Sequence, residues 1–157
     1  MSIEKVRKYL EQYGVADKIL EFDVSSATVD LAAEALNVEG APICKTMSFR
    51  TKEGANVIQM AGDARVDNRK YKDKFGEKAR FLSAEEALEF TGHPVGGVCA
   101  FAIERDDVRI YCDESLKRFD TVFPACGTGN SAIELTPDQL FEYSQSIEWV
   151  DVTKLPE

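Results

Sequence analysis

This 157-residue sequence lacks the patterns that build metal sites and disulfide frameworks. His93 is its only histidine, and its four cysteines lie far apart without a CxxC pair, so their spacing gives no zinc-ligand set. Each cysteine lies in an apolar, strand-like context that is typical of a reduced, buried thiol. We therefore expect no structural metal, no cofactor and no disulfide framework.

Long apolar segments are missing as well. No run approaches the roughly 20 residues that span a bilayer, and the charged N-terminal stretch lacks the apolar region of a signal peptide. Both absences predict a cytoplasmic protein. A composition of 44% hydrophobic and 30% charged residues is typical of a globular chain, and the length favours a single domain over residues 1–157.

The common catalytic motifs are also absent: no GxSxG, HExxH, Walker loop or GxGxxG follows a strand-like segment. The net charge of −9 argues against a broad nucleic-acid interface, which needs a basic surface. Residues 65–80 are an exception, because seven Lys or Arg against three Asp or Glu leave a local charge of +4. A solvated helix face is the ordinary interpretation, and a phosphate-bearing partner would give the stretch a second one.

Apolar periodicity predicts helices and short strands in alternation. Helices are expected at residues 3–13, 25–37, 65–80, 83–92 and 136–144, with capping boxes at Ser83 and Thr136. Strands are expected at residues 17–24, 41–49, 56–62, 96–103, 108–112, 120–127, 131–135 and 146–152, about seven of them forming the sheet. Because several strands are joined by hairpins, we predict a mixed α+β (α/β) fold with a mixed or antiparallel sheet.

The stretch APICKTMSF, residues 41–49, places Lys45 inside an apolar run that reads as a largely buried strand. An ammonium buried without a partner is costly, so Lys45 either extends to water or meets an anion. Two glycine-rich turns, GHPVGG at residues 92–97 and CGTGN at 126–130, precede strand-like segments. Tight strand turns are their ordinary interpretation, but adjacent glycines also let backbone N–H groups approach an oxyanion or phosphate.

Four motifs occur in a particular order: KT in an early strand, GDARVD after the hairpin, GHPVGGVCAF after a short helix, and GTGNSAIELTPDQL near the end. This order resembles the YbaK/EbsC family, which is related to the prolyl-tRNA synthetase editing domain, from about Val24 to Phe141. The resemblance implies a barrel-like sheet surrounded by helices. It also implies a free-standing deacylase that hydrolyses mischarged tRNA, chiefly tRNA-Pro carrying cysteine, alanine or serine. The implied partners are the tRNA acceptor end and a prolyl-tRNA synthetase.

The resemblance also assigns roles to residues. Lys45 matches the family's pocket lysine, which holds the aminoacylated 3′ end, and the two glycine turns border the amino-acid pocket and supply amides to an oxyanion. Ala100 stands where the family has a proline. The implied catalytic residues are Lys45, Gly96, Gly97 and Gly127. The implied substrate-binding residues are Thr46, Arg65, Val98, Cys99, Phe101, Thr128, Gly129 and Asn130.

Two other functions are compatible with the sequence. A non-catalytic tRNA-end or nucleotide-binding module would keep the same fold and lack the hydrolysis. A small-molecule esterase would use Cys99 or Cys126 beside the glycine turns as its nucleophile, although no histidine lies in a matching motif to activate either thiol.

Overall fold

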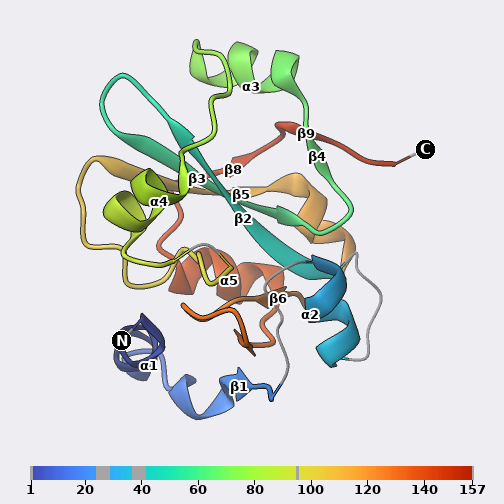
Figure 1. Cartoon of the computed structure of the whole chain (residues 1–157). Helices are drawn as coiled ribbons and strands as arrows, with labels where there is room; N and C mark the ends of the chain where they lie inside the picture. The colour runs from blue at the N-terminus through green and yellow to red at the C-terminus, as the bar shows by residue number, and fades with distance from the viewer. Residues whose placement is uncertain (1, 24–28, 37–41, 95, 157) are drawn as a thin grey trace.

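The computed structural model describes residues 2–23, 29–36, 42–94 and 96–156 (Figure 1). Its helices are α1 (Ser2–Glu11), α2 (Val29–Leu36), α3 (Asn68–Phe75), α4 (Ala84–Thr91) and α5 (Pro137–Tyr143), with two 3₁₀ helices, η1 (Ala16–Lys18) and η2 (Glu114–Arg118). Its strands are β1 (Leu20–Glu21), β2 (Ile43–Arg50), β3 (Ala55–Ala61), β4 (Arg65–Val66), β5 (Val108–Asp113), β6 (Phe123–Pro124), β7 (Ser131–Ala132), β8 (Trp149–Val150) and β9 (Thr153–Lys154). None of the helices described is long and apolar enough to cross a membrane.

The central sheet has five strands in the order β6-β2-β3-β5-β8. The hairpin β2–β3 is antiparallel, whereas β6, β5 and β8 each join their neighbour in parallel. Two further pairs, β1–β7 and β4–β9, form small antiparallel sheets. The prediction of a mixed α+β fold with a mixed sheet is confirmed, although the described strands are more numerous and shorter than expected.

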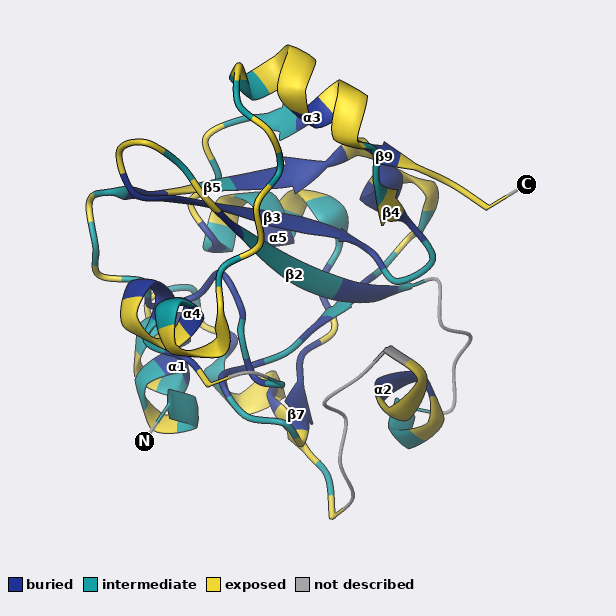
Figure 2. Cartoon of the chain, turned by 45° about the horizontal axis from the view of Figure 1, so that its top comes forward, coloured by how far each residue is buried: buried dark blue, intermediate teal, exposed yellow. Residues whose placement is uncertain are grey.

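The central sheet separates two packed layers (Figure 1). On one face, Phe49 and Ile58 pack with Tyr71 of α3. On the other face, Cys44 belongs to a cluster that includes Leu140 of α5 and the apolar side of α1. We refer to these as the α3 face and the α5 face. Every residue of β3 is buried between them (Figure 2), and five of its seven residues are apolar.

The helix ends follow from local chemistry that the sequence reveals. Ser83 and Thr136 each form the predicted capping box at the start of α4 and α5. The helix expected over residues 65–80 is wrong in extent, because α3 begins after the N-cap Asp67 and ends at Gly76, whose φ of 74° lies in the left-handed region. The residues expected to begin and end the second helix lie outside the described part of the chain.

The strand expected at residues 96–103 is wrong. This segment is irregular, and Ala102 has a positive φ of 60° that a strand does not allow. Its buried residues belong to two hydrophobic clusters, although the segment pairs with none of the described strands. The apolar run therefore reflects burial rather than strand pairing. The strands expected at residues 17–24 and 120–127 are present only as the short β1 and β6.

Candidate functional site

Lys45 lies in β2, and its half-buried side chain lies on the α3 face. Its ammonium donates hydrogen bonds to two backbone carbonyls of the turn that follows β3, those of Gly62, at 3.4 Å, and Ala64. Burial lowers the pKa of the Lys45 amino group, the negative charge of Asp63 opposes this shift, and the positive charge of Arg65 adds to it. Because carbonyls are neutral, they accept from two of the three N–H donors of the ammonium and leave its positive charge uncancelled.

Thr46 points to the opposite face of the sheet, since successive side chains of a strand alternate. Its hydroxyl is buried and has no hydrogen-bond partner among the described residues. Cys44, on the same face, belongs to the cluster that contains Cys99 and Cys126, which flank the glycine turns. Strand alternation therefore separates the ammonium of Lys45 from the hydroxyl of Thr46 and from the core beneath the glycine turns.

The two glycine turns lie against each other. A Cβ atom at Gly97 would lie 2.5 Å from backbone atoms of Gly127 and Thr128, much closer than side chains approach in proteins. Gly96 and Gly127 each have a φ of 94°, in the region that favours glycine. The absence of a side chain at Gly97 is thus required for backbone to pack directly on backbone.

Two amides of these turns already have partners. The amide of Gly97 donates to the carbonyl of Pro94 at 3.0 Å. Burial raises the pKa of the Cys99 thiol, and backbone hydrogen bonds from Phe101 and from the amide of Gly127 act in the opposite direction. An oxyanion would therefore have to displace these bonds or use neighbouring amides of the two turns.

The thiols beside the glycine turns are poor nucleophiles. Cys99 and Cys126 are fully buried, as is Phe101. Burial raises the pKa of the Cys99 thiol to about 12 and that of Cys126 well above its ordinary value. Both thiols are neutral near pH 7, whereas catalysis needs the thiolate, so the geometry argues against the esterase with a cysteine nucleophile.

His93 is a buried residue whose two ring nitrogens both have hydrogen-bond partners. It is fully buried, and its Nε2 lies 2.7 Å from the carbonyl oxygen of Phe101. A carbonyl only accepts, so Nε2 carries the proton and Nδ1 accepts from the hydroxyl of Ser2. Burial lowers the pKa of His93. The side chain therefore connects α1 to the segment that follows the first glycine turn.

The other residues expected to contact substrate are more accessible. Arg65 is exposed on β4, and it lies opposite Lys154 in the antiparallel backbone pairing of β4 with β9. Asn130 is exposed, and its side-chain amide donates to the carbonyl of Phe22 at 2.9 Å. The residues of intermediate exposure are Val98, Thr128 and Gly129.

A basic groove of about 460 Å³ lies near the hairpin end of β2. The chain after α3 runs along the edge of β2 here, where the amide of Arg50 donates to the carbonyl of Arg80 at 2.7 Å. The groove contains one carboxylate, that of Glu77, against five cationic side chains, of which Arg50 forms an ion pair with Glu86 of α4. Its charged lining consists of Arg50, Lys52, Lys72, Glu77, Lys78 and Arg80.

The basic stretch at residues 65–80 thus divides into two parts. Lys70 and Lys74 form ion pairs with Asp151 and Glu148 of the C-terminal segment, which neutralise them. Lys72, Lys78 and Arg80 line the groove instead. The β2–β3 hairpin supplies the remaining cations, Arg50 and Lys52. The net charge of residues 65–80 does not reveal that these two side chains lie on the same surface.

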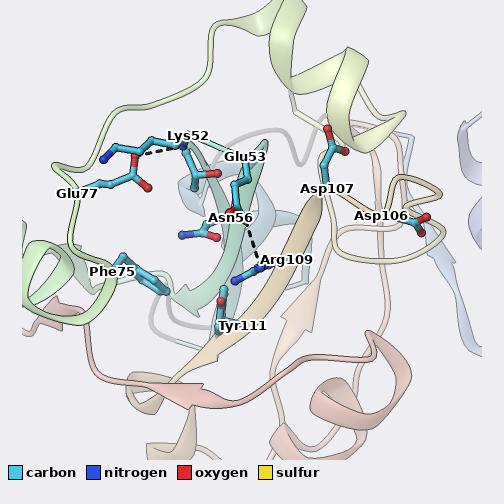
Figure 3. Close-up of a pocket in the computed structure, with 11 residues that line it drawn as sticks. Lys52, Glu53, Asn56, Phe75, Glu77, Asp106, Asp107, Arg109 and Tyr111 are labelled. Carbon is cyan, nitrogen blue, oxygen red and sulfur yellow. Dashed lines mark hydrogen bonds and ion pairs between the residues drawn. The ribbon is translucent and has the colours of Figure 1, made fainter.

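A neighbouring hollow of about 530 Å³ adjoins the groove, between the hairpin turn, the end of α3 and the start of β5 (Figure 3). Figure 3 shows Arg109 directed toward Glu53, with 3.3 Å between Nη2 and Oε2. The hollow contains four carboxylates against two cations. It therefore suits a phosphate poorly, and it lies at the opposite end of β2 from Lys45.

Sequence reasoning missed the residues that surround the ammonium of Lys45. The carbonyls of Gly62 and Ala64 come from a turn 17 and 19 residues away in the sequence. Asp63, in the same turn, is bound by Arg118, a further 55 residues along the chain. The only signal was the motif GDARVD, which contains the turn but does not reveal its contacts.

Residues 24–143 match the aminoacyl-tRNA editing domain family, so this chain belongs to that family. Its class of function is therefore aminoacyl-tRNA editing.

Among known proteins, the chain is 52% identical over 156 residues to the uncharacterized protein YwhH of Bacillus subtilis (strain 168), with 98% of each chain covered. It is 32% identical over 105 residues to a proline–tRNA ligase of Thermosipho africanus (strain TCF52B), which covers 65% of this chain and 18% of the ligase. A solved structure described as a proposed trans-editing enzyme for prolyl-tRNA synthetase superposes with a TM-score of 0.87 at 28% identity, covering 98% of this chain and 97% of the other.

Proposed function

We propose that this chain is a free-standing deacylase that hydrolyses tRNA-Pro mischarged with a small amino acid: alanine, cysteine or serine. The proposal depends above all on Lys45, whose half-buried ammonium is held by neutral carbonyls and keeps its charge for an anion. The family and the trans-editing neighbour support an aminoacyl-tRNA as the source of that anion.

The proposed reaction is hydrolysis of the ester that links the amino acid to the terminal ribose. Water adds to the ester carbonyl, the resulting oxyanion collapses, and the bond to the ribose oxygen breaks while that oxygen takes a proton. Backbone amides of the two glycine turns stabilise the oxyanion, an effect of roughly 3 kcal/mol per donor in a protease. Because an aminoacyl ester is already activated, a hydroxyl of the substrate or the side chain of the attached amino acid can assist in place of a general base.

The substrate must reach both faces of β2 to meet Lys45 and the glycine turns. β6 pairs with β2 at Ile43 and Cys44, and residues 80–82 pair with it at residues 48–50. The edge at residues 45–47 lies between these two covered stretches. A 3′ end that enters there would meet Lys45 on the α3 face and place its aminoacyl group toward the α5 face.

The basic groove extends this contact to the acceptor stem. Lys45 and Arg50 are five residues apart in β2, which corresponds to about 17 Å along a strand. A terminal nucleotide at Lys45 would therefore place stem phosphates within reach of the groove. Because the whole chain carries a charge of −9, we expect contact to be confined to the acceptor end and to be sensitive to salt. A prolyl-tRNA synthetase would be the natural partner in delivering the substrate.

The size of the amino-acid pocket would provide the specificity. A synthetase distinguishes amino acids that differ by one methylene by only about 1–3 kcal/mol, and a second hydrolytic site that admits only small side chains can supply the remainder.

Single-turnover hydrolysis of tRNA-Pro charged with alanine, cysteine, serine or proline tests the proposal. We expect selective loss of one small amino acid, retention of proline, and no hydrolysis by Lys45→Ala. If the parent protein binds these tRNAs and hydrolyses none of them, the chain is a tRNA-end binding module and the proposed chemistry is wrong.

A further inference from the structure

The turn that holds Lys45 is itself fixed by a charged pair. Both carboxylate oxygens of Asp63 accept from Arg118, at 3.2 Å from Nη1 and 2.5 Å from Nη2. This two-point geometry fixes orientation as well as distance, which a lysine cannot do. The Arg118 side chain is 35% exposed and that of Asp63 25% exposed, so solvent screens the pair only partly.

Arg118 is anchored in turn to a rigid part of the fold. Its Nε donates to the carbonyl of Ser115 at 3.0 Å within η2. The hydroxyl of Ser115 accepts from the amide of Ala61 at 3.1 Å, at the end of β3. The fully buried Asp113 caps η2 and also accepts from the amide of Val152 at 2.9 Å. The turn at residues 62–64 is therefore connected at two points to the end of the central sheet.

We propose that Asp63 and Arg118, here called the Asp63–Arg118 clamp, are positioning residues for Lys45. Arg118 anchors the turn whose carbonyls receive the ammonium, and the Asp63 carboxylate in that turn favours the charged form of Lys45. Arg118 also weakens direct pairing between Asp63 and Lys45, because its guanidinium offsets the charge of the carboxylate and takes one acceptor site on each oxygen. The ammonium thus stays oriented and charged while it remains available to the tRNA 3′ end. The expected effect of the clamp on catalysis rests on the proposed function.

Replacing Asp63 and replacing Arg118 should change the pKa of Lys45 differently. Among the described residues, Asp63 in the turn raises the pKa of Lys45 and Arg65 in β4 lowers it, while Arg118 of η2 meets Asp63 directly. Asp63→Asn keeps the shape and removes the charge, so the pKa of Lys45 should fall. Arg118→Met leaves the carboxylate in place, so the pKa of Lys45 should not fall, although the turn loses its anchor.

Titration of Lys45 in the full-length protein labelled with ¹³C at the lysine ε-carbon tests this directly, with the Lys45 signal identified from the spectrum of Lys45→Arg. Single-turnover deacylation of the charged tRNA-Pro panel is measured on the same variants. We expect Arg118→Met to lower kcat/KM by about ten- to a hundredfold, since misplacement of about 1 Å can have that effect. Arg118→Lys should restore part of the loss.

Arg105→Met is the matched control. Arg105 also binds an aspartate at two points, Asp107 at 2.9 and 2.6 Å, with similar exposure of 37% and 34%, but it lies at the other end of β5. We expect this variant to keep both the Lys45 titration and the kcat/KM of the parent.

An unchanged Lys45 pKa in Asp63→Asn, full activity in Arg118→Met, or an equal loss in Arg105→Met would each overturn the inference. If the parent hydrolyses no charged tRNA, the proposed function fails, and the Lys45 titration still decides whether the clamp acts on the lysine.

Discussion

The contact between the two glycine turns leads to a quantitative prediction for Gly97→Ala. The added Cβ would lie 2.5 Å from the carbonyl carbon of Gly127, whereas ordinary contacts begin at 3.4 Å, so the turns must separate by about 1 Å. Overpacking of this kind costs about 1–3 kcal/mol in stability. A displacement of about 1 Å at a reacting centre can lower activity by about a hundredfold. We expect both effects in Gly97→Ala.

Urea denaturation and single-turnover deacylation of the charged tRNA-Pro panel measure the two effects separately. Gly14→Ala is the control, because Gly14 has a φ of 72° and no heavy atom within 4 Å of a Cβ. The unfolding free energy of this variant should fall by about 1–2 kcal/mol, because an alanine is strained at a positive φ. Its activity should equal that of the parent. If Gly97→Ala retains the activity of the parent, the close contact of the turns has no role in the reaction, and the oxyanion site must lie elsewhere.

Three further predictions concern stability and binding. Because burial lowers the pKa of His93, its contribution to stability is complete above about pH 6.5 and is lost as the pH falls toward the folded-state pKa; the fall in Tm between pH 7.5 and 5.5 should be smaller in His93→Gln. Thr46→Val should leave the unfolding free energy unchanged or raise it, because the buried hydroxyl has no partner among the described residues; a loss above 1 kcal/mol would reveal a hidden hydrogen bond. Lys72→Gln and Lys78→Gln should each reduce the slope of log affinity for tRNA-Pro against log salt by about 0.7–0.9; unchanged slopes would exclude phosphate contacts in the groove.

Local signals in the sequence predicted the elements whose chemistry is local. The capping boxes at Ser83 and Thr136 involve residues three positions apart, so the sequence displays both partners. The segment at residues 96–103 was mistaken for a strand because apolar composition reports burial and does not specify a hydrogen-bonding partner. Ala102 could adopt its positive φ only because tertiary packing outweighs local preference there.

The surroundings of Lys45 could not be predicted for a different reason. The sequence raised the question of what meets a lysine in an apolar strand, but the partners are carbonyls of Gly62 and Ala64, which every residue type possesses. Composition carries no information about a backbone acceptor. The clamp adds Arg118, which pairs with Asp63 only because η2 follows β5 at the same end of the sheet as the turn after β3.

Lys45 differs from other lysines of this acidic chain in a way that would favour anion binding at one place. Lys70 and Lys74 are paired with carboxylates, which offset part of the positive charge of each. Lys45 is bound by carbonyls, and the carboxylate nearest to it in the turn is occupied by Arg118. A half-buried charge is also screened less by water than an exposed one. Under the proposed function, we therefore expect the 3′ end to be attracted to Lys45 and the acceptor stem to the basic groove, while the net charge of the chain disfavours contact at other surfaces.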